Sequence, residues 1–463
     1  MNNEKQKTSA TAKKGLSIVF LTIFIDLVGF SIIFPLFPEM LDFYLAQEEA
    51  KETPGILAQL IEKIPNRTEH GLDLRTVLFG GLLGSLYSLL QFIFSPIWGA
   101  RSDRKGRKHI LKQTVFATAI GYFIWIFAGN LWLLFLSRII AGIASGNLAV
   151  ATAAVADITT RENRSKGMAL VGIAFGLGFI IGPAIGGLSA TISKDWTSFG
   201  LNPFSFPAII SCGLALLNLW QIHNRFQETL PQASIKDDKP SDPANTQRSR
   251  YPIFNLLHIK DPAILQLCIL HLLFFITFSG MEFTLTFLAK ERLSFGAEQN
   301  GLMFIVIGVT MIFVQGIFVR RLSKPVGEKN LVIAGIISGT LAFWLLSNAP
   351  TMVVNQFWSG TFFGSQFLLG LLFMSCAIGL FNPCITTLVS LYAPAEHQGR
   401  DLGLLRSAGA LARVLGPIMA SILYFLYSSG TAYRLGAIIL MIPLVLALML
   451  KNPPKEDNAT PNS

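Results

Sequence analysis

A short basic loop reads Gly99-Ala-Arg-Ser-Asp103-Arg104-Lys-Gly106-Arg107-Lys108 and separates two apolar runs, at 77–98 and 110–128. Its ten residues include five bases, one acid and two glycines. Each flanking run is long enough to form a helix that crosses about 30 Å of hydrocarbon. The segment therefore predicts a tight turn between two membrane-spanning helices, and its bases place that turn on the cytoplasmic side.

The composition is typical of a membrane protein. Of the 463 residues, 52% are hydrophobic and only 14% are charged, which is unlike an ordinary soluble domain. Backbone groups in lipid need partners within their own segment, so the apolar runs predict helices. The net charge of +10 lies in short loops, so we read it as a topology signal and expect no nucleic-acid partner. The four cysteines lie inside apolar runs, where we expect them to be core residues.

Twelve spans are predicted, so the fold class is an all-α membrane protein. Because the number of crossings is even, both termini lie on one side. The segments on that side hold most of the 37 Lys and Arg residues, which makes it the cytoplasmic side. The predicted spans are 16–38, 76–98, 110–128, 131–156, 166–190, 204–223, 263–288, 299–320, 331–347, 367–392, 400–427 and 432–450.

The chain divides into two similar halves. Gly182-Pro183 recurs as Gly416-Pro417, and Asn147 recurs as Asn382, about half a chain later. A degenerate copy of the basic loop, without its aspartate, runs from Gly316 through Gly327 to Lys329. The Pro-, Ser- and Lys-rich stretch near the midpoint has linker composition. We therefore expect six-helix bundles at 1–225 and 259–463, with a cytoplasmic linker at 226–258.

The pattern G-x-x-x-D-R-x-G-R-K resembles the signature loop between helices 2 and 3 of the major facilitator superfamily, a family of secondary transporters. The resemblance implies twelve helices in two pseudo-symmetric bundles. In that family the loop aspartate docks against the start of helix 11, and the loop bases pair with the end of helix 4. It thus implies an inner latch formed by Gly99, Asp103, Arg104, Gly106, Arg107, Asp157 and Arg400.

Two charged residues are predicted to meet within the first bundle. An arginine inside a span costs about 2.5–3.5 kcal/mol on insertion scales, so Arg138 requires a cavity or a partner. Counting along the predicted spans puts Asp26 of helix 1 at a similar depth. Burial raises the pKa of a carboxyl group and a nearby cation lowers it, so a carboxylate beside a movable cation can bind and release a proton. We therefore predict that Asp26 is the proton carrier and that Arg138 is its partner.

Helix 5 carries small residues at helical spacing, which lets two helices approach closely. Its pattern G-x-x-x-G-P-x-x-G-G resembles the antiporter signature of drug exporters in the same superfamily. That signature comprises Gly178, Gly182, Pro183, Gly186 and Gly187.

The resemblance extends along most of the chain. The start of helix 1, Ile25-Asp26-Leu-Val-Gly29-Phe30, and the stretch Phe226-Gln-Glu228-Thr229-Leu230-Pro231 are similar to tetracycline efflux proteins. The second half, for example Leu405-Arg406-Ser407-Ala-Gly409, is closer to the tetracycline-transporter-like branch. The cavity residues that hold tetracycline in the resistance proteins are not recognisable in this sequence.

Several polar residues in the spans are candidates for binding. Glu282 and Arg413 are expected at similar depths, where the pair binds a charged substrate, couples a second proton or holds helices together. His271 is expected to be a satisfied core residue. Polar side chains suited to a central substrate cavity are Asn147, Gln315, Asn382, Arg406 and Arg413.

The sequence thus predicts a proton-coupled antiporter that exports amphipathic organic molecules or drugs from the cell, in the bacterial inner membrane. The alternatives are an exchanger or exporter of a specific organic anion and, from another class, a subunit of a proton-translocating assembly. No clustered metal-binding motif supports a membrane enzyme, so we expect no enzymatic activity. We expect a monomer with a small-molecule substrate, no cofactor and no metal, driven by the proton gradient.

Overall fold

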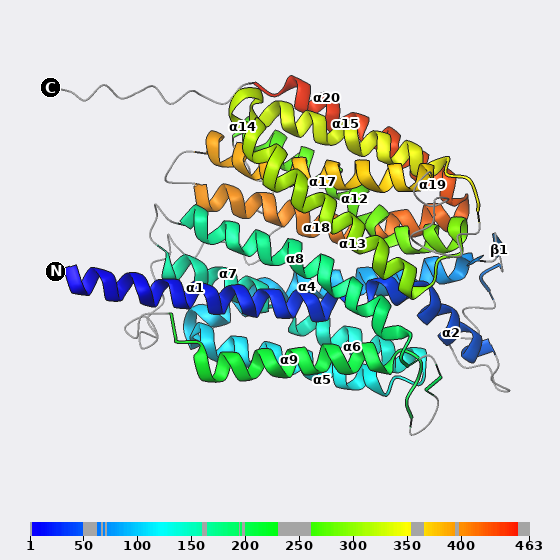
Figure 1. Ribbon diagram of the computed structural model, residues 1–463, viewed down its shortest axis with the longest axis horizontal. Helices are drawn as coiled ribbons and strands as arrows, with labels where there is room; N and C mark the ends of the chain where they lie inside the picture. Colours follow the sequence, from blue (N-terminus) through cyan, green and yellow to red (C-terminus); the bar gives the residue numbers. More distant parts are fainter. Residues whose placement is uncertain are drawn as a thin grey trace. The chain divides into compact units, whose positions relative to one another are not determined.

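The computed structural model describes residues 2–49, 63–65, 68–69, 72–159, 164–193, 195–196, 200–229, 261–352, 365–393 and 398–451. These residues are nearly all helical (Figure 1). Their two short strands, β1 (Thr68–Glu69) and β2 (Leu72–Asp73), pair antiparallel. Ten helices in these segments are long and apolar enough to cross a membrane.

Each of the twelve predicted spans overlaps one or more of the described helices. Those of the first half are α1 (Asn2–Ser31), the 3-10 turn η1 (Phe34–Leu36), α2 (Phe37–Glu49), α4 (Leu74–Lys105), α5 (Arg107–Ile126), α6 (Leu131–Ala144), α7 (Asn147–Ile158), α8 (Arg164–Ala190) and α9 (Ser205–Arg225). Those of the second half are α12 (Pro262–Leu293), α13 (Ala297–Phe313), the π-helical η2 (Val314–Val319), α14 (Arg320–Val326), α15 (Glu328–Ser347), α17 (Gln366–Tyr392), α18 (Gln398–Leu426), α19 (Ser429–Ile439) and α20 (Met441–Met449).

Polar residues begin several of these helices. The side chain of Asn130 accepts a hydrogen bond from the Leu133 N–H at the start of α6 (3.0 Å). Ser365 does the same for α17, with the Leu368 N–H at 3.1 Å. Such caps satisfy backbone donors that have no partner in the first turn. They therefore fix where each apolar run becomes helical.

The first span is longer than predicted. The predicted span stops at Pro38, whereas the helical path continues through η1 and α2 to Glu49. Proline is tolerated in the first turn of a helix, because its missing N–H is not needed there. Pro35 lies at the start of η1 and Pro38 at the start of α2. The two prolines therefore bend the path without ending it.

The described residues pack as two compact units. The first comprises those of Met1–Tyr251, Phe283–Gly308 and Thr351–Phe357, and the second comprises the rest. The C-terminal part of α12 and the N-terminal part of α13 thus pack with the first half of the chain. Most of the predicted linker lies outside the described residues.

Each unit contains the same serine-to-helix contact. In the first, the Ser31 hydroxyl of α1 donates to the Gly178 carbonyl of α8 (2.9 Å). In the second, the Ser279 hydroxyl of α12 donates to the Ala412 carbonyl of α18 (3.0 Å). In both helices the acceptor lies four residues before the glycine of the Gly-Pro pair. The internal repeat read from the sequence therefore extends to the packing of equivalent helices.

The basic loop is repeated in its backbone as well. Gly106 has φ +91° and ψ 147° before α5, and Gly327 has φ +84° and ψ 148° before α15. Each glycine N–H bonds to a serine carbonyl four residues earlier, at Ser102 and Ser323. Positive φ is easily adopted only by glycine. The degenerate copy of the loop at Gly327 therefore has the same turn, although it lacks the aspartate.

An apolar core holds the helix ends beside the basic loop. Val19 and Ile23 of α1, Ile110 of α5, Val155 of α7 and Phe226 after α9 are buried together. Helices α5 and α9 lie side by side along their length (Figure 1). This packing positions the loop, the end of α7 and the segment after α9 against one another.

Candidate functional site

A break in the fourth span positions Asn147. Helices α6 and α7 are separated at Ser145 and Gly146, where a Cβ on Gly146 would overlap the Trp98 side chain. The Trp98 indole donates to the Ile143 carbonyl (2.6 Å), which lies next to the break. Asn147 therefore starts a new helix with its side chain buried.

Asn147 contacts the acid of the first span. Its side-chain amide donates to a carboxylate oxygen of Asp26 on α1, at 2.5 Å. The other amide atom, Asn147 Oδ1, is buried without a hydrogen-bond partner. Asp26 thus lies in a membrane-spanning helix, and its hydrogen-bond donor is a neutral amide. Because the donor carries no charge, the carboxyl group can still bind or release a proton.

Arg138 is buried against aromatic rings. Its guanidinium carbon lies 4.7 Å from the Trp125 ring centroid and 5.8 Å from that of Tyr122. It also donates to the Ser137 hydroxyl (3.0 Å). Aromatic faces attract a cation, especially in a desolvated site. These rings, which the sequence reasoning did not assign to Arg138, therefore stabilise its charge within the span.

The expected direct pair of Asp26 with Arg138 is absent from the described contacts. Asp26 is level with Asn147, nine residues beyond Arg138, which corresponds to about 13 Å along a helix. The depth estimate from sequence was wrong because it counted Asp26 from the inner end and Arg138 from the outer end of a core of about 30 Å. Their two spans hold 35 and 28 residues and are longer than this core, so the two residues lie further apart. Tyr87 and Tyr122 are within electrostatic range of both charges. The roles of Asp26 and Arg138 in proton coupling stay predictions.

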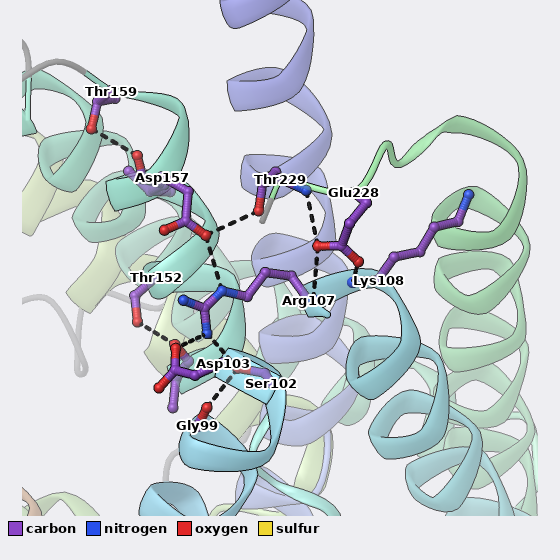
Figure 2. Close-up of polar contacts among 12 residues, drawn as sticks. Gly99, Ser102, Asp103, Arg107, Lys108, Thr152, Asp157, Thr159, Glu228 and Thr229 are labelled. Atoms are coloured by element: carbon purple, nitrogen blue, oxygen red, sulfur yellow. Dashed lines mark hydrogen bonds and ion pairs between the residues drawn. The ribbon is translucent and has the colours of Figure 1, made fainter. Parts of the chain in front are cut away.

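The basic loop forms a compact charged cluster (Figure 2). Arg107 is 5% exposed, and its guanidinium contacts Asp157 at the end of α7 (2.9 Å) and Asp103 one turn earlier (2.5 Å). It also donates to the Ser102 hydroxyl (2.6 Å). The expected pairing of a loop base with Asp157 is thus present. Its role as a latch stays a prediction.

Glu228 secures the start of α5 (Figure 2). Its carboxylate accepts hydrogen bonds from the backbone N–H groups of Arg107 (2.9 Å) and Lys108 (3.0 Å). The next residue, Thr229, donates from its hydroxyl to Asp157 (3.1 Å). A carboxylate at a helix N-terminus satisfies free donors and favours the helix dipole. The segment after α9 therefore contacts both residues of the Arg107–Asp157 pair, Arg107 through Glu228 and Asp157 through Thr229.

The charge on Arg107 is maintained by these carboxylates. Burial lowers the pKa of Arg107, but the hydrogen bond that Arg107 donates to Asp157 and the charge of Asp103 outweigh this effect, so the pKa is raised. Arg104 is exposed, and a Cβ on Gly99 would meet no atom of the described residues within 4 Å. The expected contact of Asp103 with Arg400 cannot be placed, because the Arg400 side chain lies outside the described residues.

Replacing Glu228 with alanine is expected to destabilise the first unit by about 1–2 kcal/mol, the usual cost of losing a helix cap. Thermal unfolding of the purified protein in detergent measures the loss. Glu298→Ala is the matched control, because Glu298 is likewise an exposed acid at the start of a helix, α13, but makes no hydrogen bond or ion pair within the described residues. Equal melting temperatures for the two variants would show that the Glu228 cap contributes nothing.

Three glycines of the antiporter-like pattern pack against α1 and the residue that follows it. A Cβ on Gly178 would lie 2.6 Å from the Leu27 Cβ, and one on Gly182 would lie 2.7 Å from the Val28 carbonyl oxygen. A Cβ on Gly186 would overlap the Ile32 carbonyl. Helix α8 continues through Pro183. The small residues therefore allow the close α1–α8 approach that the spacing predicts, while the link to antiport stays a prediction.

Further contacts join α2 to the parts of α12 and α13 in the same unit. Glu39 accepts a hydrogen bond from the Ala297 N–H (2.9 Å), at the start of α13, and Lys290 pairs with Asp42. A Cβ on Gly187 would overlap the Ala297 carbonyl oxygen. Sequence reasoning missed Glu39, Asp42 and Lys290. No local pattern relates residues about 250 positions apart.

The remaining candidates lie in the second unit. Arg406 and Arg413 are exposed on α18, Asn382 is exposed on α17 and Gln315 is exposed in η2. Arg413 acts electrostatically on Glu282 of α12, but the described contacts include no ion pair between them. The structure thus brings Glu282 near Arg413 without joining them, and leaves Asn147 in the first unit with Asp26.

Taken together, the helices, the partly buried acid inside a span and the charged loop define a membrane protein of the transporter class. A family model described as "Major Facilitator Superfamily" matches residues 19–364 and 349–463. The chain belongs to the major facilitator superfamily, and its fold is the twelve-helix fold of that family.

Two curated proteins and one solved structure cover most of the chain. Major facilitator superfamily domain-containing protein 10 of Mus musculus is 31% identical over 96% of this chain and 94% of its own length. The class E tetracycline resistance protein of Escherichia coli is 27% identical over 88% and 87%. The crystal structure of the human organic anion transporter MFSD10 (TETRAN) has a TM-score of 0.69 at 29% identity, covering 94% of this chain and 99% of that one.

Proposed function

We propose that this protein exports amphipathic organic molecules in exchange for protons. The observation that carries the proposal is the Asp26 carboxylate, held by Asn147 inside a membrane-spanning helix. Ionisable residues inside spans are costly and mark ion or substrate paths. The similarity to tetracycline resistance proteins supports export of an organic molecule.

In the proposed cycle, Asp26 binds a proton from one side of the membrane and releases it to the other. Protonation removes a partly buried charge from a membrane-spanning helix, so it shifts the balance between two packed arrangements of the helices. The Arg107–Asp157 contact acts as a latch that forms in one arrangement and opens in the other. Arg138 holds a fixed positive charge in the same bundle and is the second residue of the proposed proton-coupling site.

The proposed protein works as a monomer without a cofactor, driven by the proton gradient, in the bacterial inner membrane. Both termini are assigned to the cytoplasm. The basic loop at Gly99–Lys108 supports this orientation, because short cytoplasmic loops are enriched in Lys and Arg.

Transport of an organic anion is the second candidate. The exposed Arg406 and Arg413 of α18 favour a negatively charged substrate. One similar protein of known structure is described as an organic anion transporter. In this version Glu282, near Arg413, takes part in proton coupling.

Purified protein in liposomes is expected to move fluorescent organic molecules only when a pH gradient is imposed. The panel includes cationic, neutral and anionic molecules of similar size, and a protonophore that collapses the gradient is the control. Transport that is equal with and without the gradient contradicts proton coupling. Movement of the anionic members alone selects the second candidate over the first.

A further inference from the structure

Helix α18 has two exposed faces. Arg406 and Arg413 are exposed and lie about two turns apart, on the same face. Four large apolar side chains are also exposed, at about 180–240° around the helix from Arg413. These are Leu415, Met419, Ile422 and Leu426, with exposed fractions of 37%, 43%, 39% and 53%.

Only one of these faces suits lipid. Leucine, isoleucine and methionine are stable against hydrocarbon, whereas an arginine in a membrane-spanning helix faces the protein interior or water. The apolar face is therefore the lipid face, and the basic face points away from lipid into a space that water reaches. Within the described part of the chain, Arg413 makes neither a hydrogen bond nor an ion pair. Its donors are thus available to a ligand.

A neighbouring stripe on α12 lies at the same level. His271, Phe275, Phe278 and Glu282 follow the spacing i, i+4, i+7 and i+11, which places them on one face of the helix. A Cβ on Gly409 would lie 2.7 Å from His271 Nε2. Together with the Ser279–Ala412 hydrogen bond, this contact sets Arg413 at a height between His271 and Glu282, close to that of the two phenylalanines.

Aromatic contacts hold the stripe in place, and one of its buried polar atoms lacks a hydrogen-bond partner. Its Phe275 ring lies 4.4 Å from the His271 ring, and behind it Phe274 stacks on Phe381 of α17 at 3.7 Å and 9°. Phe274 and Phe381 are fully buried, whereas Phe275 and Phe278 are partly exposed. His271 is 6% exposed, yet its Nδ1 has no hydrogen-bond partner. A buried polar atom without a partner is unusual and marks a place for a ligand group or water.

We propose that Arg413 and the α12 stripe bind an aromatic carboxylate, with the carboxylate on Arg413 and the flat ring against Phe275 and Phe278. This assignment rests on the second candidate of the proposed function, transport of an organic anion, and specifies its substrate class. Glu282 is the internal carboxylate at the end of the stripe, and it competes with the ligand for Arg413. A guanidinium pairs with a planar carboxylate through two parallel hydrogen bonds, and the phenylalanine rings supply apolar contact. A cation would be repelled by Arg413.

Naphthoate and its uncharged analogue naphthamide test the proposal by calorimetric titration of the purified protein without a pH gradient. Naphthoate is expected to bind more tightly than naphthamide. Arg413→Gln is expected to weaken naphthoate binding by about tenfold to a hundredfold, the usual worth of a hydrogen bond to a charged group. Glu282→Gln is expected to tighten naphthoate binding several-fold, because it removes the competing charge.

Arg434→Gln serves as the control, because Arg434 is an exposed arginine of the same unit on α19. It is expected to leave naphthoate binding unchanged. The proposal is overturned if naphthamide binds as tightly as naphthoate, if Arg413→Gln binds naphthoate like the parent, or if the parent binds neither. Because binding needs no gradient, a protein that binds naphthoate but shows no proton-driven transport contradicts the proposed function and leaves this site intact.

Discussion

Asp26→Asn is expected to abolish proton-driven transport and to leave a folded, inserted protein. Asparagine has the shape of aspartate and still accepts the hydrogen bond from Asn147. It carries no titratable group, so the cycle loses its proton carrier. In reconstituted liposomes, transport under a pH gradient should fall to the level of protein-free vesicles, while the melting temperature stays equal to that of the parent or rises.

Two further variants make this result specific. Asp195→Asn removes an exposed carboxylate between α8 and α9 and is expected to transport normally. Asn147→Ala keeps the acid but removes its hydrogen bond, so it should retain transport with an altered pH dependence. Full gradient-driven transport by Asp26→Asn would assign the proton to another group, of which Glu282 is the next candidate.

The twelve spans and the loop contact could be predicted because they depend on local features. Apolar runs of helical length define the spans, whatever their neighbours are. The Arg107–Asp157 contact followed from a resemblance in which both partners lie in recognisable motifs. Apolar runs and motifs are recognised from local sequence patterns, so a single sequence reveals them.

The partner of Asp26 could not be predicted, for two physical reasons. The depths of Asp26 and Arg138 were counted from opposite faces of a core of about 30 Å, whereas their spans hold 35 and 28 residues and are longer than this core. The fourth span breaks at Gly146, which turns Asn147 toward α1. Depth and direction both depend on packing between helices, which periodicity does not report.

Contacts between distant segments were equally hidden. The spacing of the glycines in α8 predicted a close helix approach but did not identify α1 as the neighbour. Gly187 belongs to the same pattern, yet it faces Ala297 and Gly301 instead of α1. The two exposed faces of α18 became visible only once burial was known. Partners of this kind require the fold.

Gly186→Ala is expected to destabilise the protein strongly although alanine is the better helix former. The added methyl group would overlap the carbonyl oxygen of Ile32, the residue directly after α1, and this backbone atom cannot rotate away. Overpacking a core costs about 1–3 kcal/mol, and this site belongs at the upper end because α1 and α8 must separate along their length. Thermal unfolding in detergent, and loss of transport in liposomes, measure the effect.

Gly176→Ala on the same helix gives the matched comparison. A Cβ at Gly176 would meet no atom of the described residues within 4 Å, so only helix propensity acts, and the change should stabilise by up to about 1 kcal/mol. The same substitution ten residues apart thus has opposite expected signs. If both variants melt above the parent, the α1–α8 approach is looser than the structure has it, and the glycine pattern then serves a purpose other than packing.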